Sequence, residues 1–330
     1  MRIAICHHFD LDFYSGGEKF VIQMSNELTK LGHTVSVYTT PFIIEGRKAL
    51  LNAHKLLLDE VHFEKGWHHT PQADIVYVMY DPYTPINKTI FDLSKCQSKI
   101  TGVHSSSFWE PVTLMYGKVP NVGRIAQFFF GNYELSRYDA VHTLTNAFKL
   151  NHPNIYVIPN YVDSSIYKIT DKKSKFTVAF TSRHSNAKGY DVFQEVTKNL
   201  DVDVAVSSGN MAETDLIDLV ATSHLSFLPS KVDTFGYSIV ESIMSGTPVL
   251  TTLLEAHKQL KLPLMYSNSN RNFGKSINVF KRIFEETKQE YDTWCLIGRQ
   301  AAKRFYDKQV VLEQFENMLL EVHKRKCYAS

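Results

Sequence analysis

The sequence predicts an α/β protein of two doubly wound domains, each a parallel sheet with helices on both faces. Three observations lead to this expectation. Apolar runs of strand length alternate with amphipathic helical patterns from the first residue onward. The alternation pauses over residues 160–175 and then starts again. The chain has 330 residues, of which 44% are hydrophobic, and this is enough to form two cores.

In the first half, six apolar runs of strand length accompany one clear helical pattern. Residues 17–31 carry apolar side chains at helical spacing, and Gly32 follows as a helix stop. The expected strands span residues 2–6, 33–39, 74–79, 100–104, 140–144 and 155–158. Residues 107–135 are rich in aromatic side chains and have no clean period. For this stretch we favour a hydrophobic core under a long loop, with an acceptor pocket or a membrane contact as the alternatives.

In the second half, strands and helices alternate more regularly. The expected strands span residues 176–181, 202–207, 224–228 and 248–252, and the expected helices span 190–200, 213–221 and 235–245. From residue 274 onward the chain is expected to be mostly helical. The pattern predicts an N-terminal domain over residues 1–160 and a C-terminal domain over residues 161–309.

The composition gives no general sign of a polyanionic partner. The net charge is +2, and residues 1–160 hold equal numbers of basic and acidic side chains, so neither half is a basic nucleic-acid module. The four cysteines form no CxxC pair, which argues against a zinc site and fits a reducing compartment. No apolar run approaches the ~20 residues of a membrane-spanning helix, and the start MRIAICHHF is unlike a signal peptide. We expect a cytoplasmic protein, with peripheral contact to the cytoplasmic face of a membrane as an open alternative.

Two loops after expected strands carry groups suited to an anionic ligand, because ligands of parallel sheets bind beyond the carboxyl ends of the strands. Arg183 and Lys188 share the loop after the strand at 176–181, where they can direct two cations at one place. Fixed cations stabilise the charge that develops on a diphosphate leaving group. Ordinary solvated surface charges are the alternative, and for an isolated Arg/Lys pair they are the better explanation.

The second loop opens the helix expected at 235–245. Backbone N–H groups around Gly236 would form an anion site at the helix N-terminus. The Asp233 carboxylate is placed to accept sugar hydroxyls, and Glu241 to accept two hydroxyls of a ribose. The simpler alternatives are a helix N-cap for Asp233 and an exposed helix residue for Glu241.

These residues resemble the motifs of retaining glycosyltransferases of the GT-B fold, in particular glycosyltransferase family 4 (glycosyl transferases group 1). That family carries Glu-x-Phe-Gly, a second Glu eight positions after the first, and then Gly-x-Pro-Val. The corresponding residues here are Asp233, Phe235, Gly236, Glu241, Gly246, Pro248 and Val249.

Four further elements match the family in chain order, and the whole set spans residues 15–249. They are Gly16-Gly17 before an amphipathic helix, His104 after a strand, a Val-Ile-Pro-Asn junction that includes Asn160, and Arg183 followed by Lys188-Gly189. Two departures stand out. Asp233 replaces the first Glu and has a shorter reach, and Tyr161 replaces the glycine of the junction.

The resemblance implies two Rossmann-like doubly wound domains facing across a cleft, with the donor held mainly by the C-terminal domain. The last helix, residues 310–330, would return to the N-terminal domain. The implied catalytic residues are His104, Arg183, Lys188 and Asp233. The implied donor-binding residues are Gly16, Gly17, Asn160, Arg183, Lys188, Phe235, Gly236, Tyr237, Ser238 and Glu241. His104 would contact the sugar or support charge at the reaction centre.

The sequence therefore predicts a retaining glycosyltransferase (a hexosyltransferase or similar, EC 2.4 class) that moves a sugar from a UDP- or GDP-sugar to a glycan, glycolipid or protein-linked sugar. The resemblance also implies that no metal and no other cofactor is needed, because in that family cations and backbone amides take the place of a metal. One alternative is transfer to nucleic-acid bases, against which the balanced charge argues. Another is a non-catalytic nucleotide-sugar-binding partner protein, which the Asp233 substitution keeps open. A nucleotide-sugar epimerase or phosphorylase is a weaker option.

Overall fold

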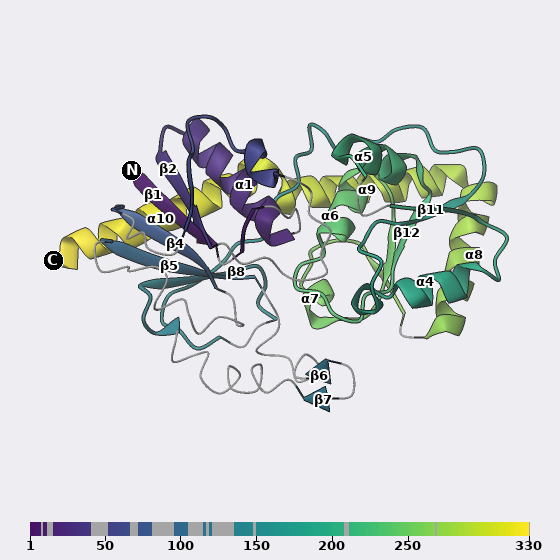
Figure 1. The fold of residues 1–330 in the computed structure, drawn as a ribbon. Helices are drawn as coiled ribbons and strands as arrows, with labels where there is room; N and C mark the ends of the chain where they lie inside the picture. Colours follow the sequence, from purple (N-terminus) through teal and green to yellow (C-terminus); the bar gives the residue numbers. More distant parts are fainter. Residues whose placement is uncertain are drawn as a thin grey trace. The chain divides into compact units, whose positions relative to one another are not determined.

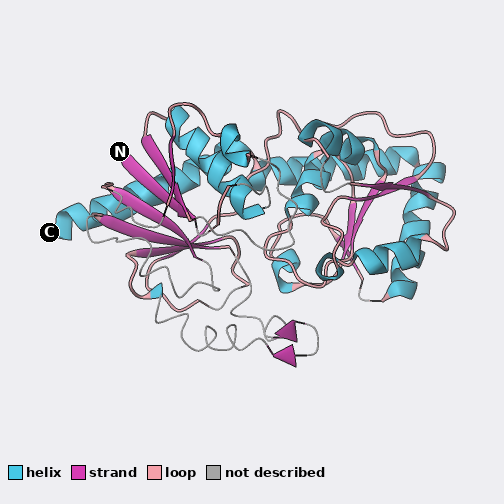
Figure 2. Cartoon of the chain, viewed as in Figure 1, coloured by secondary structure: helices cyan, strands magenta, loops and turns pink. Residues whose placement is uncertain are grey.

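The computed structural model divides the chain into two compact units, coloured along the sequence in Figure 1 and by secondary structure in Figure 2. Unit 1 comprises Met1–Pro159 and Leu312–Ser330, and unit 2 comprises Asn160–Val311. The residues that the structure describes are 1–7, 9–11, 16–40, 52–66, 72–80, 96–104, 115–116, 119–120, 135–147, 150–207, 211–267 and 269–329.

The main sheet of unit 1 has seven parallel strands in the order β3-β2-β1-β4-β5-β8-β9. These strands are β1 (Arg2–His7), β2 (Thr34–Thr39), β3 (His62–Lys65), β4 (Ile75–Tyr80), β5 (Ser98–Val103), β8 (Ala140–Thr143) and β9 (Ile155–Val157). The 3₁₀ turn η1 (Ala53–Leu56) precedes β3, and β6 (Met115–Tyr116) and β7 (Val119–Pro120) form a separate antiparallel pair. Because β1 lies between β2 and β4, the winding of the sheet reverses beside β1, where doubly wound sheets bind ligands.

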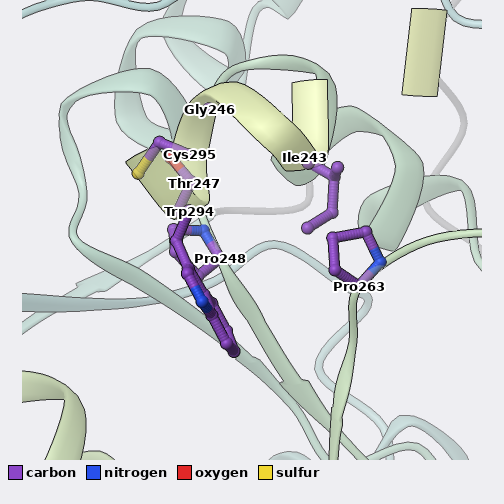
Figure 3. A pocket seen from close by; sticks show the side chains of 8 residues that line it. Ile243, Gly246, Thr247, Pro248, Pro263, Trp294 and Cys295 are labelled. Atoms are coloured by element: carbon purple, nitrogen blue, oxygen red, sulfur yellow. The ribbon is translucent and has the colours of Figure 1, made fainter. Parts of the chain in front are cut away.

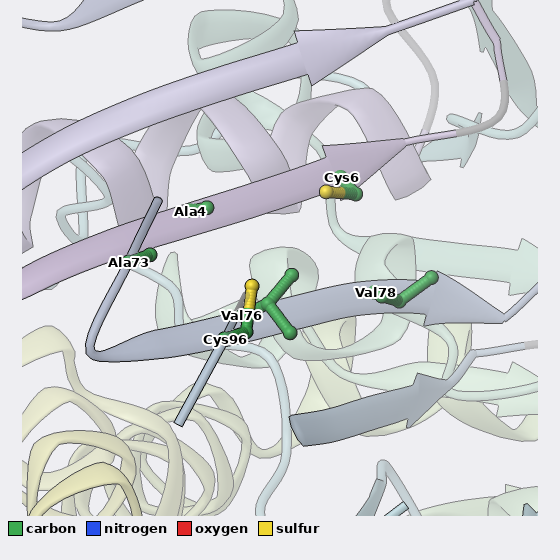
Figure 4. Close-up of a cluster of buried hydrophobic side chains, with 6 residues drawn as sticks. All are labelled: Ala4, Cys6, Ala73, Val76, Val78 and Cys96. Carbon is green, nitrogen blue, oxygen red and sulfur yellow. The ribbon is translucent and has the colours of Figure 1, made fainter. Parts of the chain in front are cut away.

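Strands buried on both faces make up the core of unit 1. β1 and β4 are nearly continuous apolar runs, as expected for parallel strands covered on both sides. Figure 4 shows one cluster of small side chains along them, formed by Ala4, Cys6, Ala73, Val76, Val78 and Cys96. Both cysteines of the cluster are buried and outside any disulfide, so they pack as small apolar side chains.

The first and the last helix contribute to this same core. Helix α1 (Gly16–Lys30) follows β1 and buries an apolar stripe that includes Phe20. Helix α10 (Lys308–Ala329) begins in unit 2 and belongs to unit 1 from Leu312 onward. The buried Phe315 ring of α10 lies 5.7 Å from the ring of Phe20 and 5.4 Å from that of Tyr77 on β4. The end of the chain therefore packs against its beginning.

The sheet of unit 2 has five parallel strands in the order β11-β10-β12-β13-β14. The strands are β10 (Thr177–Phe180), β11 (Asp203–Val206), β12 (Leu225–Leu228), β13 (Val249–Thr251) and β14 (Met265–Tyr266). The helices are η4 (Asn186–Lys188), α4 (Tyr190–Thr197), α5 (Glu213–Thr222), α6 (Tyr237–Met244), α7 (Glu255–Lys258), α8 (Asn270–Glu286) and α9 (Lys288–Tyr306). Here the winding reverses between β10 and β12.

The predicted class of two doubly wound α/β domains is confirmed, and each predicted strand lies within two residues of its expected bounds. The sequence pattern does not predict β3 and β14, which lie at the edges of their sheets. β3 (HFEK) and β14 (MY) are short and lack the continuous apolar run that marks a strand buried on both faces. The aromatic side chains between Phe108 and Tyr133 lie outside the described residues, as does Ser15. Among the helices described, none combines the length and apolarity needed to cross a membrane.

Candidate functional site

Three loops at one edge of the unit 2 sheet carry the charged residues of the candidate site. They follow β10, β12 and β13, which are neighbours in the sheet and end at the same edge. Lys188 lies on the first loop and Asp233 on the second, while His257 lies on α7 after the third strand. The first two loops flank the point where the winding of the sheet reverses, which is the usual ligand-binding position in this architecture.

The loop after β10 holds Lys188 by means of its own turn. Ser185 Oγ accepts a hydrogen bond from Lys188 N at 3.3 Å and so caps η4. Gly189 ends the turn with a φ of 73°, in the left-handed region. A Cβ at Gly189 would lie 1.9 Å from Pro229 O, so glycine is required for this loop to approach the end of β12.

Hydrogen bonds join the loops after β10 and β12. Ala187 O accepts from Lys231 N at 2.9 Å and from Val232 N at 3.1 Å. The Lys231 ammonium also donates to Asp191 Oδ2 at 2.7 Å. The two backbone donors, Lys231 and Val232, directly precede Asp233 in the sequence. Their bonds to Ala187 therefore fix the position of the Asp233 backbone.

Asp233 lies between the side chains of Lys188 and His257. Its Oδ2 atom is 2.9 Å from Lys188 Nζ and 3.4 Å from His257 Nε2, and its Oδ1 atom accepts from Thr234 N at 2.8 Å. The side chains of Asp233 and Lys188 are 11% and 18% exposed. Burial raises the pKa of the Asp233 carboxyl, but Lys188 and His257 lower it by more, so this pKa lies far below its usual range. Asp233 is therefore a carboxylate at neutral pH.

The hydrogen bonds of the fully buried His257 fix the orientation of its ring. Its Nδ1 atom lies 3.1 Å from Thr251 Oγ1 and 3.2 Å from Thr252 O. The Thr251 hydroxyl already donates to Leu228 O, so both neighbours accept and Nδ1 must carry a proton. The other ring nitrogen, Nε2, faces the Asp233 carboxylate. The distance of 3.4 Å between them is long for an aligned hydrogen bond.

The next residues of the loop open α6. Gly236 occupies the N-cap position and brings no capping side chain, so the alternative that Asp233 is the helix cap is wrong. The Ser238 hydroxyl donates to Thr181 O at 3.1 Å, which ties the first turn of α6 to the end of β10. The predicted Gly236 and Ser238 thus lie on a helix N-terminus joined to the loop of Lys188.

Phe235 and Glu241 are both buried. The Phe235 ring lies 5.9 Å from Tyr306 and meets Tyr237 edge-on at 5.4 Å, so this side chain belongs to the core. The Glu241 carboxylate accepts a hydrogen bond from the Tyr167 hydroxyl at 3.1 Å. Glu241 is therefore not the exposed helix residue of the simpler alternative.

Two further predicted residues of unit 2 differ in exposure. Arg183 is exposed on the loop that carries Lys188. Asn160 is buried, and its Oδ1 atom has no hydrogen-bond partner in the part of the chain that the structure describes.

The sequence motifs identify both Arg183 and Asn160 but not His257, because the histidine matches no family motif. Its position after the third strand of the same sheet edge is the signal that could have identified it.

The predicted residues of unit 1 lie near the carboxyl edge of its own sheet. Gly16 and Gly17 begin α1 after β1, and His104 directly follows β5. His104 Nε2 is 2.9 Å from the Tyr77 hydroxyl, which in turn lies 2.6 Å from His142 Nδ1. The sequence motifs do not identify Tyr77 and His142, although a polar side chain inside a buried apolar strand is a usable signal.

A separate hollow on unit 2 is lined by the motif residues Gly246 and Pro248 but by none of the predicted catalytic or donor-binding residues. Figure 3 shows its mostly apolar lining, which includes Ile243, Pro248, Pro263, Trp294 and Cys295. This hollow lacks the convergent charges that an anionic ligand needs, so the candidate site remains at the edge of the sheet.

No model of a known protein family matches this sequence, and no curated protein matches it by sequence. Solved structures do match it over almost its whole length. Sucrose-phosphate synthase from Thermosynechococcus elongatus has a TM-score of 0.74 at 12% identity, covering 98% of this chain and 99% of the other. Anabaena HepE, solved with UDP and glucose, has a TM-score of 0.70 at 15% identity, covering 97% and 100%. An α-glucosyltransferase solved with UDP-glucose and DNA has a TM-score of 0.64 at 12% identity, covering 97% and 99%.

These neighbours are glycosyltransferases of the GT-B fold, and the chain shares their fold. The predicted assignment to the GT-B class is thereby confirmed. At these levels of identity the similarity is one of architecture, so the activity has to be argued from the site.

Proposed function

We propose that this chain is a retaining glycosyltransferase of the family 4 type that uses a UDP- or GDP-sugar as donor. The observation that carries the proposal is the cluster of Lys188, Asp233 and His257 at the carboxyl edge of the unit 2 sheet. With Arg183 on the same loop as Lys188, two permanent cations stand against the one carboxylate of Asp233, where doubly wound sheets bind nucleotides. The UDP and UDP-glucose bound by the neighbouring glycosyltransferases support the same donor class.

In this proposal the donor diphosphate lies beyond the end of β10. Lys188 and Arg183 balance the charge that grows on the diphosphate as its bond to the sugar breaks, so they act most strongly in the transition state. Backbone N–H groups at Gly236 and Ser238, at the start of α6, add to the positive electrostatic potential around the diphosphate. The acceptor hydroxyl attacks from the face that the nucleotide leaves, and its proton passes to the departing phosphate oxygen. No protein nucleophile is then required.

The remaining predicted residues position the donor. Asp233, with the backbone of Phe235, accepts hydroxyls of the transferred sugar, since a carboxylate oxygen can accept more than one hydrogen bond. Glu241 binds the ribose, exchanging its bond from Tyr167 for ribose hydroxyls. Tyr237 and Asn160 contribute to the same donor site.

Fixed cations take the part that a metal ion plays in other transferases. We therefore propose that the reaction needs no metal, and activity should be unchanged after dialysis against EDTA. A loss of activity that added Mg²⁺ or Mn²⁺ restores would contradict this.

For the acceptor we propose a glycan, glycolipid or protein-linked sugar, in the cytoplasm or at the cytoplasmic face of a membrane. The near-neutral net charge of +2 fits an uncharged acceptor better than a polyanion. A nucleic-acid base remains the second candidate, because one structural neighbour was solved with DNA. Salt-dependent binding of duplex DNA would favour that second candidate.

The proposal is tested with a panel of UDP- and GDP-sugars. A matching donor should raise the melting temperature, because a ligand that binds only the folded protein stabilises it. The same donor should release its nucleotide slowly by itself and faster with an acceptor. Lys188→Ala should lower the rate of nucleotide release by on the order of 100-fold, since it removes a charge aimed at the leaving group.

Lys281→Ala is the matched control in the same unit. Lys281 pairs with the exposed Asp201 at 2.8 Å, on α8 and away from the predicted site residues. Its removal should leave nucleotide release unchanged. Absence of any thermal shift across the panel, together with equal behaviour of Lys188→Ala and Lys281→Ala, would refute the proposed function.

A further inference from the structure

Three polar side chains of unit 1 form a continuous hydrogen-bonded chain across neighbouring strands. His104 Nε2 lies 2.9 Å from Tyr77 Oη, Tyr77 Oη lies 2.6 Å from His142 Nδ1, and His142 Nε2 lies 2.8 Å from Ile158 O. Tyr77 is on β4, His104 follows β5 and His142 is on β8, so the chain crosses three adjacent strands. Both Tyr77 and His142 are fully buried.

A glycine on β5, the middle of the three strands, leaves room for these hydrogen bonds. Gly102 lies on β5 between Tyr77 and His142, opposite His142 in the ladder. A Cβ at Gly102 would lie 1.8 Å from Tyr77 Oη and 3.0 Å from His104 Nε2. Only glycine leaves room for the tyrosine hydroxyl to reach both histidines.

The carbonyl oxygen of Ile158, at one end of this series of hydrogen bonds, determines which atom is the donor in each bond. Ile158 O can only accept, so His142 Nε2 carries a proton. His142 Nδ1 of the neutral ring is then an acceptor, and the Tyr77 hydroxyl donates to it. The Tyr77 oxygen is left to accept from His104 Nε2, which must therefore carry a proton. Neutral His104 consequently has its lone pair on Nδ1.

The surroundings keep these groups neutral. The Phe20 ring lies 4.4 Å from that of His104, and Phe315 lies 5.4 Å from that of His142. Burial lowers the pKa of His142 to about 4, even though the bond to Ile158 opposes the shift. Burial, together with the neighbouring His142 and His7, lowers the pKa of His104 well below its ordinary value.

We propose that Tyr77 and His142 are positioning residues, which hold His104 as the Nε2–H tautomer and present its Nδ1 as a hydrogen-bond acceptor to a hydroxyl of the substrate. His104 is partly exposed, and in the described part of the chain its Nδ1 has no hydrogen-bond partner. This inference rests on the proposed sugar-transfer function for the identity of the substrate. It narrows the role of His104, because a neutral acceptor binds a sugar or acceptor hydroxyl and gives no charge stabilisation to a phosphate.

The tautomer can be measured without any substrate by ¹⁵N NMR of the imidazole nitrogens at pH 7.5. The wild type should show His104 with a protonated Nε2 and an unprotonated Nδ1. In Tyr77→Phe the hydroxyl is gone, so His104 should exchange between both tautomers. Tyr291→Phe is the matched control, because it removes another buried tyrosine hydroxyl, bonded to His224 O at 2.7 Å in unit 2. It should leave the His104 signals unchanged.

Kinetics with UDP-glucose provide the second readout. Tyr77→Phe should lower kcat by on the order of 10- to 100-fold, as expected for a misoriented group, while the donor KM changes by less than about twofold. Tyr291→Phe should lose thermal stability to a similar extent and keep its kcat. Circular dichroism melting of both variants separates misfolding from a loss of positioning.

Each result bears on the inference. Protonated Nδ1 in wild-type His104, or a Tyr77→Phe variant with unchanged tautomer and unchanged kcat, would overturn it. A fixed Nε2–H tautomer that is lost in Tyr77→Phe supports it. The NMR result stands apart from turnover, so a protein that shows this tautomer but uses no nucleotide sugar would refute the proposed function and not the tautomer assignment.

Discussion

Lys188 Nζ lies 2.9 Å from Asp233 Oδ2, so the two residues assigned to the diphosphate and to the sugar form one ion pair. His257 lies on the other side of the same carboxylate at 3.4 Å. In the proposed function, a diphosphate that draws the Lys188 ammonium to itself would leave the His257 ring facing Asp233. In the proposed site this arrangement would let an aspartate take the place of the longer glutamate, since the short side chain lies between Lys188 and His257.

The first prediction concerns Asp233→Glu. An added methylene would have to fit between Lys188 and His257, which already lie 2.9 and 3.4 Å from the carboxylate, and overpacking of this kind costs about 1–3 kcal/mol. We expect Asp233→Glu to lower the rate of nucleotide release and the unfolding free energy, measured by donor turnover and urea denaturation. An activity far above that of the wild type would instead mark the natural site as degenerate and favour a non-catalytic binding protein.

A second prediction concerns His257→Phe, which keeps an aromatic ring but removes the Nδ1–H bonds to Thr251 and Thr252 and the nitrogen that faces Asp233. Loss of these buried bonds should reduce the unfolding free energy by about 1–3 kcal/mol. The donor kcat/KM should fall on the order of tenfold, because Asp233 would then compete more strongly for Lys188.

His224→Phe is the control for this substitution. His224 is equally buried and bonded through Nδ1 to Thr177 N at 3.0 Å, but it lies at the start of β12 and not beyond its carboxyl end. The His224→Phe variant should have a lower unfolding free energy than the wild type but the same donor kcat/KM. Equal kinetic effects in the two histidine variants would show that His257 has no role in the site.

The third prediction is that Gly189→Ala separates the loop after β10 from the loop after β12. The new Cβ would overlap Pro229 O, and the φ of 73° is unfavourable for alanine. We expect a loss of about 2–4 kcal/mol in unfolding free energy and weaker donor binding by thermal shift. Gly32→Ala is the matched control, since Gly32 has a φ of 88° with nothing within 4 Å of its Cβ, and backbone strain alone should cost about 1 kcal/mol there. Equal losses in the two variants would show that the Pro229 contact is unimportant.

The fourth prediction is a pH dependence of stability that originates at His142. Its pKa is about 4 in the folded protein, against an ordinary value of 6.5, so the unfolded chain binds the proton more tightly. The contribution of neutral His142 to the unfolding free energy is fully present above pH 6.5. It is lost as the pH falls toward 4, by about 3 kcal/mol in total. Urea unfolding of wild type and His142→Phe at pH 7.5 and 4.5 should show a steeper acid loss in the wild type. Parallel losses in both proteins would place the acid sensitivity elsewhere.

Much of the candidate site follows from local sequence. Lys188-Gly189 and the loop from Asp233 to Gly236 each follow an apolar run that forms a strand, and a turn residue marks the start of each helix. Parallel strands bring the residues after their carboxyl ends to one edge, so the order of strands and loops along the chain already predicts that these loops are neighbours. The same reasoning does not reach His257, because α7 is a single helical turn without a periodic pattern.

By itself the sequence determined the α/β class, the order of strands and helices along the chain, and the loops that carry Arg183, Lys188 and Asp233. These features depend on side-chain periodicity and on turn residues, which act over a few neighbouring positions. Only the tertiary structure decided that His257 pairs with Asp233, and that Tyr77, His104 and His142 form one hydrogen-bonded chain beside Phe315. Such contacts depend on which strands become neighbours in the sheet and on where the last helix packs, and the packing of the whole core settles both.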